Sequence, residues 1–141
     1  MVNILVVDDK SEDLQDLKQA AEGEGRRIVT ANSREQALRF ISENDFDVVL
    51  TDLELESGSL TGGIDVLNAA KEKDPYTEVV VVTGRGTPEV GVKAMALGAF
   101  DYILKGALGI NIPAMIRAKV TKAIEFRRAQ LQPGVVTANQ P

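Results

Sequence analysis

Acidic and polar residues that could do chemistry follow the short hydrophobic runs of this chain. Asp8 and Asp9 end the first run, Asp52 the third, Thr83 the fourth and Lys105 the fifth. If these runs are parallel strands of one sheet, their carboxyl ends meet at the same edge, and the three carboxylates crowd together there. Two like charges about 4 Å apart repel by roughly 4 kcal/mol at an effective dielectric near 20. The cluster therefore needs more positive charge than one lysine supplies.

A divalent cation would offset two further negative charges, and ligation by oxygens alone, with room for water, indicates Mg²⁺. Mg²⁺ beside a free carboxylate, a hydroxyl and a lysine provides what phosphoryl transfer requires: an oxygen nucleophile, charge neutralisation and donors to the equatorial oxygens. The arrangement predicts a phosphoaspartate. Each residue taken alone could be an ordinary turn, capping or loop residue. Their coincidence at four strand ends is what favours a site.

The composition limits the other kinds of chemistry. The chain has 141 residues, a formal net charge of -5 and 44% hydrophobic residues, which is typical of one globular domain. It contains neither cysteine nor histidine. A disulfide framework, a thiolate nucleophile, a Ser-His-Asp triad, a histidine-ligated zinc and a phosphohistidine on this chain are therefore excluded.

The chain also gives no sign of membrane or nucleic-acid binding. Its longest apolar runs are far shorter than the roughly 20 residues that a spanning helix needs. Its acidic net charge offers no basic excess with which to neutralise phosphates. We expect a cytoplasmic protein that binds neither membrane nor nucleic acid directly.

The hydrophobic patterning predicts the elements that position these residues. Five short runs are too short for helices and mostly lack polar alternation, which favours buried parallel strands; they cover residues 4–7, 27–30, 48–51, 79–82 and 102–104. Helices are predicted between them: one capped by Ser11, one opened by a capping box of Ser33 and Gln36, and three over residues 64–73, 88–98 and 113–131. The fold class is α/β: a doubly wound, flavodoxin-like parallel sheet of five strands in the order 2-1-3-4-5, with five helices.

Four motifs together resemble the receiver domain of bacterial two-component response regulators. They are Ile4-Leu5-Val6-Val7-Asp8-Asp9, Val48-Val49-Leu50-Thr51-Asp52, Val82-Thr83-Gly84 and Gly98-Ala99-Phe100-Asp101-Tyr102-Ile103-Leu104-Lys105. The resemblance covers about residues 2–125. It implies a receiver domain over residues 1–125, followed over residues 126–141 by the extended end of the last helix and a polar tail or linker.

The resemblance also implies roles for individual residues. Asp52 would be the phosphoacceptor, taking the phosphoryl group from a phosphohistidine on a partner, and Thr83 and Lys105 would contact the phosphoryl oxygens. Asp9 and Asp52 would ligate Mg²⁺ with the backbone carbonyl of Glu54, while Asp8 would act mainly through a bound water. Tyr102 lies at the switch position: it would turn inward when Thr83 moves toward the phosphate, and so remodel the surface of helix four, strand five and helix five. An ordinary aromatic residue at the edge of the core is the alternative for Tyr102.

The chain departs from the usual family pattern at three places. The stretch 53–63 is longer than usual, lacks the common Met-Pro pair and is predicted to be a mobile flap over the site. Gly84, followed by Arg85 and Gly86, predicts a flexible loop before the fourth helix. Gly106 stands where the family usually has a proline whose cis bond orients the lysine loop, so the placement of Lys105 is left open.

Two functions follow from these observations, and a third is weaker. The first is a phosphorylatable receiver of a response regulator, which catalyses only its own phosphoryl transfer and dephosphorylation and is not a turnover enzyme. The second is a receiver-like interaction module that is not phosphorylated. The third is an aspartyl phosphatase, which is disfavoured because Glu54, two residues after Asp52, lies on the wrong strand for that family.

The resemblance implies a sensor histidine kinase or a histidine phosphotransfer domain as the partner. Since the chain has no histidine of its own, the donor histidine must belong to another domain or protein. An output domain, a downstream protein or a phosphorylation-dependent dimer would then receive the signal. The hydrophobic spacing of the last helix continues past residue 125 into Phe126 and Leu131. This continuation slightly favours a fragment of a longer protein over a stand-alone regulator.

Overall fold

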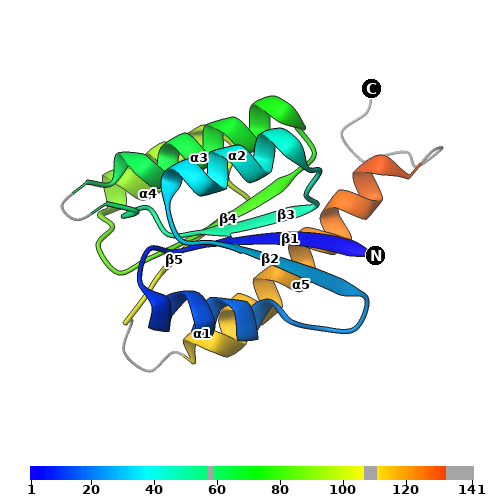
Figure 1. Cartoon of the computed structure of the whole chain (residues 1–141), viewed down its shortest axis with the longest axis horizontal. Helices are drawn as coiled ribbons and strands as arrows, with labels where there is room; N and C mark the ends of the chain where they lie inside the picture. Colours follow the sequence, from blue (N-terminus) through cyan, green and yellow to red (C-terminus); the bar gives the residue numbers. More distant parts are fainter. Residues whose placement is uncertain (57–58, 107–110, 133–141) are drawn as a thin grey trace.

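Strands and helices alternate along the chain in the computed structural model, which describes residues 1–56, 59–106 and 111–132 (Figure 1). The five strands of this part are β1 (Val2–Val7), β2 (Arg26–Ala31), β3 (Val48–Thr51), β4 (Glu78–Thr83) and β5 (Asp101–Leu104). Its helices are α1 (Ser11–Ala21), α2 (Arg34–Glu43), α3 (Thr61–Lys73), α4 (Pro88–Ala96) and α5 (Ile112–Leu131). Each predicted strand lies within an observed one.

The strands form one parallel sheet in the order β2-β1-β3-β4-β5, which confirms the predicted topology. The central strand β1 has Val7 opposite both Ala31 of β2 and Thr51 of β3. Because these registers align the carboxyl ends of β1 and β3, the residues that follow the two strands lie side by side.

Helices cover both faces of the sheet, which explains why the strands are almost continuously hydrophobic. Leu5, Val49 and Val81 belong to the core that packs under α2, α3 and α4. Adjacent strand residues that point to the other face of the sheet, such as Ile4 and Val80, belong to the core under α1 and α5. Figure 1 shows these two helical layers above and below the sheet. Burying each such side chain stabilises the fold by roughly 1.5–3 kcal/mol.

Local capping sets where the helices begin. Ser33 accepts a hydrogen bond from the N–H of Gln36 at 3.1 Å, and the Gln36 side chain accepts one from the N–H of Asn32 at 2.8 Å, so the predicted capping pair is confirmed. The prediction that Ser11 caps α1 was wrong: Lys10 is the capping residue and makes no side-chain capping bond. The Asp8 side chain accepts from the Lys10 N–H at 3.0 Å, and this local turn starts the helix one residue earlier.

The predicted flap over residues 53–63 is partly wrong. Helix α3 begins at Thr61, three residues before the predicted start, and Leu53 and Leu55 are buried in the core. A Cβ atom on Gly63 would collide with the backbone of Asp52 and Leu53, so only glycine lets α3 begin against the site. Residues 57–58 lie outside the described residues, and a flap there stays a prediction.

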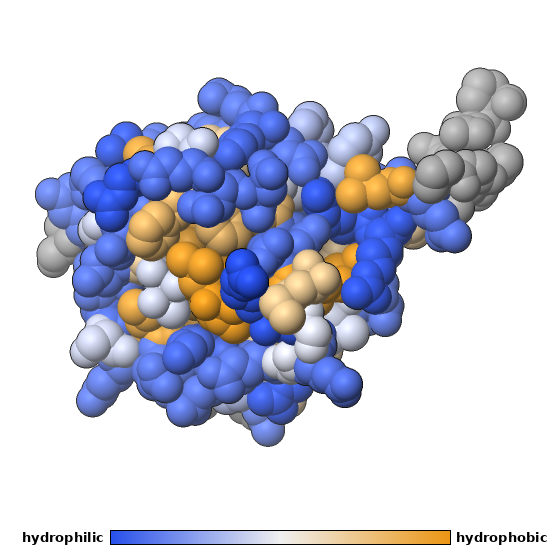
Figure 2. Space-filling model, turned by 45° about the vertical axis from the view of Figure 1, so that its right-hand side comes forward, coloured by the Kyte–Doolittle hydropathy of each residue, from blue (hydrophilic) through white to orange (hydrophobic). Residues whose placement is uncertain are grey.

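Helix α5 is continuous from Ile112 to Leu131, as predicted, and its last turns extend beyond the sheet on the side of the N-terminus (Figure 1). The tail over residues 133–141 lies outside the described residues, so the proposed linker stays a prediction. Figure 2 shows hydrophobic surface between the two helical layers, along the edge where β2 lies. Within the described part of the chain, no helix combines the length and apolar character needed to cross a membrane.

Candidate functional site

The backbone hydrogen bonds of the sheet continue past the ends of β1 and β3 and bring two carboxylates together. The N–H of Asp52 donates to the carbonyl of Val7 at 3.0 Å, and the N–H of Asp8 donates to the carbonyl of Ala31 at 3.2 Å. On the neighbouring strands, the N–H of Lys105 donates to the carbonyl of Thr83 at 2.8 Å. The predicted strand-end residues are thus held by the backbone at one edge of the sheet.

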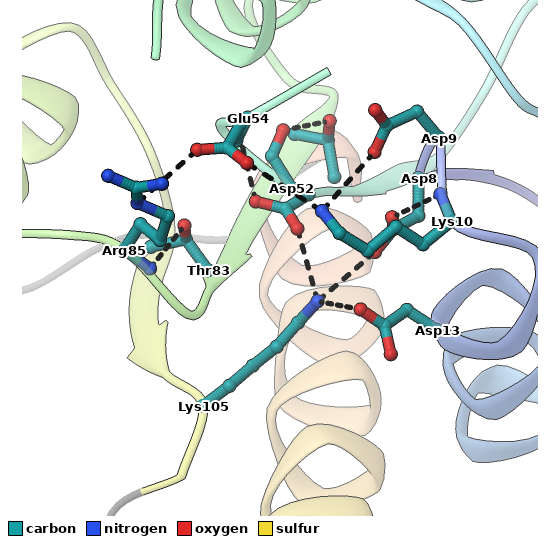
Figure 3. Close-up of polar contacts among 10 residues, drawn as sticks. Asp8, Asp9, Lys10, Asp13, Asp52, Glu54, Thr83, Arg85 and Lys105 are labelled. Atoms are coloured by element: carbon teal, nitrogen blue, oxygen red, sulfur yellow. Dashed lines mark hydrogen bonds and ion pairs between the residues drawn. The ribbon is translucent and has the colours of Figure 1, made fainter. Parts of the chain in front are cut away.

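The ammonium group of Lys105 lies at the centre of this site (Figure 3). Its Nζ atom is 3.1 Å from Asp8 Oδ2, 3.1 Å from Asp52 Oδ2 and 3.2 Å from Asp13 Oδ2. An ammonium group has three protons, so each proton has one carboxylate partner. Burial alone would lower the pKa of Lys105, but the negative charges of Asp52 and Asp8 raise it above its usual value. Lys105 therefore stays charged.

The two central carboxylates are withdrawn from solvent. Asp8 is 0% exposed and Asp52 is 3% exposed. Burial raises the pKa of Asp8, although the hydrogen bond from Lys10 and the charge of Lys105 partly offset this effect. The second oxygen of Asp52, Oδ1, accepts a hydrogen bond from the N–H of Glu54 at 3.0 Å. The hydrogen bond from Lys105 and this backbone donor together fix the orientation of the Asp52 carboxylate.

A second layer of charge surrounds this centre. Lys10 Nζ lies 3.8 Å from Asp9 Oδ1 and 3.7 Å from Glu54 Oε1, and Arg85 Nε lies 3.4 Å from Glu54 Oε2 (Figure 3). With the inner layer included, five carboxylates face three cationic side chains. Two negative charges therefore have no compensating side chain, which fits the predicted need for a divalent cation.

The carboxylates of the described residues do not converge three at a time on one point that could hold a metal ion. Asp8 and Asp52 turn toward Lys105, whereas Asp9 turns toward Lys10. The donor set nevertheless consists of oxygens only, and its charge deficit of two is the charge of Mg²⁺. The residues fit such an ion provided that the lysine contacts rearrange.

Thr83 and Tyr102 meet at the end of β4. Thr83 is fully buried, and its hydroxyl accepts a hydrogen bond from the N–H of Arg85 at 3.2 Å, which leaves the hydroxyl proton for an acceptor. The Tyr102 hydroxyl is buried without a hydrogen-bond partner among the described residues. A Cβ atom on Gly86 would collide with both the Tyr102 hydroxyl and the Thr83 methyl group, so both side chains border the same point. Tyr102 thus points inward here, and burial raises its pKa.

Two features of the lysine were not predicted. Gly106 adopts a positive φ of 77°, so the turn after Lys105 uses the conformational freedom of glycine. Asp13 joins the site from α1, 92 residues away from Lys105 in sequence. The only signal for Asp13 was an acidic residue in the first turn of the helix that follows the first strand, which more often serves the helix dipole.

Comparisons with known proteins agree with this geometry. Residues 4–117 match the family described as response regulator receiver domain. The alginate biosynthesis transcriptional regulatory protein AlgB of Pseudomonas aeruginosa is 34% identical over 125 residues, which are 89% of this chain and 26% of that protein. A putative NtrX-like response regulator of Rickettsia bellii is 34% identical over 74% of this chain and 22% of its own length. The chain thus spans about a quarter of the length of these relatives.

Solved structures show the same fold. A response regulator receiver domain from Clostridium thermocellum superposes with a TM-score of 0.76 at 32% identity, covering 93% of this chain and all of that one. A response regulator from Burkholderia pseudomallei, solved with a phosphorylated aspartic acid, a calcium ion and citrate, has a TM-score of 0.71 at 25% identity over 97% of this chain and 77% of its own. From its fold, its strand-end carboxylates and these matches, the chain belongs to the response regulator receiver domain family.

Proposed function

We propose that this receiver domain accepts a phosphoryl group on Asp52 and passes the signal on through the surface of α4, β5 and α5. The observation that carries the proposal is the buried Asp52 carboxylate, which shares the Lys105 ammonium with Asp8 at equal distances of 3.1 Å. A carboxylate that is oriented and partly desolvated is a competent nucleophile. We infer that an Asp52 oxygen attacks phosphorus while the bond from phosphorus to the donor nitrogen breaks.

The surrounding donors fit the charge that develops in this transfer. The hydrogen bond that Lys105 donates to Asp52 can be redirected to an oxygen of the incoming phosphoryl group, and the Thr83 hydroxyl can donate a hydrogen bond to another. Lys105 would keep its contact with Asp13 during this change. The domain transfers one phosphoryl group to itself, so we propose a switch that does not turn over substrate.

Mg²⁺ is the cofactor that the donor set supports. Asp9 and Asp52 would hold the ion with the backbone carbonyl of Glu54, and Asp8 would act through water. When bound, the ion supplies the two positive charges that the cluster lacks. For the ion to bind, Lys10 must give up Asp9, which costs little because their contact is 3.8 Å long and Lys10 is 56% exposed.

Exposed hydrophobic residues on α4 and β5 support the proposal that the surface of α4, β5 and α5 binds a partner. Val92 and Met95 on α4 and Leu104 on β5 are 71%, 46% and 44% exposed. Tyr102 packs between this surface and Thr83, because Gly91 of α4 leaves room for its ring. We propose that phosphorylation engages the Thr83 hydroxyl and thereby stabilises the inward Tyr102, which favours binding of an output domain, a downstream protein or a second receiver.

The proposed phosphoryl donor is a phosphohistidine on a sensor histidine kinase or a histidine phosphotransfer domain. Incubation with acetyl phosphate and Mg²⁺, followed by intact-mass measurement, tests the acceptor without that partner. We expect a gain of one phosphoryl group in the parent protein and none in Asp52→Asn. If the parent takes up no phosphoryl group under saturating Mg²⁺, the non-phosphorylated interaction module becomes the better description.

A further inference from the structure

A second pocket lies at the opposite end of β4. Its Glu78 pairs with Val48, four residues before the proposed acceptor, which is about 13 Å along the sheet at 3.3 Å per residue. It has a volume of about 420 Å³ and opens between the end of α3, the turn before β5 and the last half of α5. Its lining includes Lys71, Tyr76, Glu78, Phe100, Phe126 and Gln130. The proposed phosphorylation uses none of these residues, so the inference below stands apart from it.

Glu78 lines this pocket and has no side-chain hydrogen-bond or ion-pair partner among the described residues. The residue is 4% exposed, and its carboxylate makes no hydrogen bond or ion pair with any residue that the structure describes. Burial raises the pKa of Glu78, and the charges of Lys71 and Arg127 only partly offset this effect. Among the described residues the Tyr102 hydroxyl is the one fully buried side-chain polar atom without a partner, so the Glu78 oxygens reach solvent.

The two nearest cations are held elsewhere. Lys71 Nζ donates to the carbonyls of Pro75 at 2.6 Å and Thr77 at 2.9 Å, which fixes it on the chain after α3. Arg127 donates to Asp47 at 2.8 Å and to Asp74 at 3.0 Å. Glu78 is therefore left as the unpaired acid of the pocket, and its charge is available to a ligand.

Aromatic rings also line this pocket. The rings of Phe100 and Phe126 lie 5.6 Å apart, centroid to centroid, at an angle of 51°. Phe126 is 47% exposed and Tyr76 is 45% exposed, so both rings are accessible to a group that enters the pocket. The face of an aromatic ring carries negative potential, so a cation placed over it is attracted. The Glu78 carboxylate and the aromatic rings of the pocket thus both favour a cationic ligand.

We propose that this pocket binds the side chain of an arginine from a partner polypeptide. A hard inorganic cation requires several oxygen ligands, whereas the pocket offers one carboxylate. A guanidinium group can lie flat against an aromatic ring and donate two hydrogen bonds to a single carboxylate, and its aliphatic stem suits hydrophobic walls. Lysine would make a single point contact and lose the stacking. The pocket therefore selects arginine.

Titration of the ¹⁵N-labelled domain with N-acetyl-arginine amide, followed by amide chemical shifts, tests the proposal. We expect saturable shifts centred on Glu78, Phe100 and Phe126. Dissociation constants should be at least fivefold higher for Glu78→Gln and for Phe126→Ala. Glu125→Gln, which removes an equal charge from an exposed position next to Phe126, should bind as the parent does.

Two further probes separate a specific site from general charge attraction. N-acetyl-norleucine amide keeps an aliphatic chain but has no charge, and it should cause no saturable shifts. N-acetyl-lysine amide should bind at least threefold more weakly than the arginine probe. The proposal is overturned if the arginine probe gives no saturable shifts, if Glu78→Gln binds as well as the parent, or if Glu125→Gln weakens binding as much as Glu78→Gln. Phe126→Ala keeps Glu78 in place, so it decides the matter if Glu78→Gln fails to fold.

Discussion

Both ends of the parallel sheet carry clustered charge, buried where the strands end and half-buried where they begin, and the two clusters are balanced differently. Where the strands end, Lys105 serves Asp8, Asp13 and Asp52 at once, and two negative charges of the cluster remain uncompensated. Where the strands begin, Arg127 of α5 lies 2.8 Å from Asp47 and 3.0 Å from Asp74, so one cation serves two acids that also accept backbone hydrogen bonds.

The pKa shifts of Asp8 and Asp74 record this difference, whereas Glu78 is an exception at the amino end, where burial raises its pKa. At the carboxyl end of the strands, burial raises the pKa of Asp8. At the amino end, burial opposes the change, yet hydrogen bonds from the Tyr76 amide and from Arg127 lower the pKa of Asp74. A carboxylate with a raised pKa is destabilised in its charged form, whereas one with a lowered pKa is stabilised. The first arrangement suits ligand chemistry and the second holds α5 to the sheet.

The largest effect on stability is expected where the strands begin, at the pairs of Arg127 with Asp47 and Asp74. Arg127→Met leaves the half-buried Asp47 and Asp74 without their shared cation and should lower the free energy of unfolding by about 2 kcal/mol, since two hydrogen bonds between charged groups are lost. Urea denaturation measures this loss. Arg128→Met removes a neighbouring exposed arginine and should change the free energy by less than about 0.5 kcal/mol. Similar losses in the two variants would show that the Arg127 pairs contribute nothing specific.

Removing one carboxylate at each end should change stability in opposite directions. Near pH 7, Asp8→Asn should raise the free energy of unfolding and Asp74→Asn should lower it, each by about 1 kcal/mol. The sign follows from the pKa shifts. The unfavourable contribution of Asp8 exists above its raised folded pKa and disappears as the pH falls toward 3.8. The favourable contribution of Asp74 exists above 3.8 and is lost as the pH falls through its lowered folded pKa.

Unfolding curves of the parent and both variants, recorded from about pH 7 downward, measure these two contributions. Both differences from the parent should shrink on acidification. If Asp8→Asn is destabilising at neutral pH, the carboxyl end of the sheet is balanced after all, and the contrast between the two ends disappears.

The smallest stability change is expected for Asp13→Asn. Asp13 is 38% exposed, so its pair with Lys105 should contribute less than about 0.5 kcal/mol. The rate of phosphoryl uptake from acetyl phosphate should nevertheless fall by about fivefold, which corresponds to roughly 1 kcal/mol of barrier, because the Lys105 ammonium loses its contact with a carboxylate outside the proposed metal and acceptor set. Asp13→Glu should restore most of the rate. Unchanged uptake in Asp13→Asn would mean that the contact does not position Lys105.

The arrangement of the strands was predictable from the sequence because it depends on local pattern. Continuous β-branched runs such as Val79–Val82 indicate buried parallel strands, and Asp8, Asp52, Thr83 and Lys105 follow directly from where those strands end. The start of α3 was not predictable, because it depends on the close approach of Gly63 to the backbone of Asp52.

Contacts between distant residues were also beyond the sequence pattern. Asp13 and Lys105 are 92 residues apart, and Arg127 is 80 residues from Asp47. Nothing in the spacing of either pair distinguishes it from ordinary solvated charges on a helix. Glu78 was missed for a related reason: the predicted strand began at Val79, so the acid that opens β4 lay outside it. Such residues need the packed structure before their partners become visible.

Chemical trapping of the acceptor tests the proposed function most directly. Borohydride reduces an aspartyl phosphate to homoserine and leaves a free carboxylate unchanged. After treatment of the parent protein with acetyl phosphate and Mg²⁺, we expect peptide mass spectrometry to find homoserine at position 52 and nowhere else. The conversion should be lost when Mg²⁺ is omitted. Homoserine in place of Asp8, Asp9 or Asp13, or no conversion at all, would contradict the assignment of Asp52 as the phosphoacceptor.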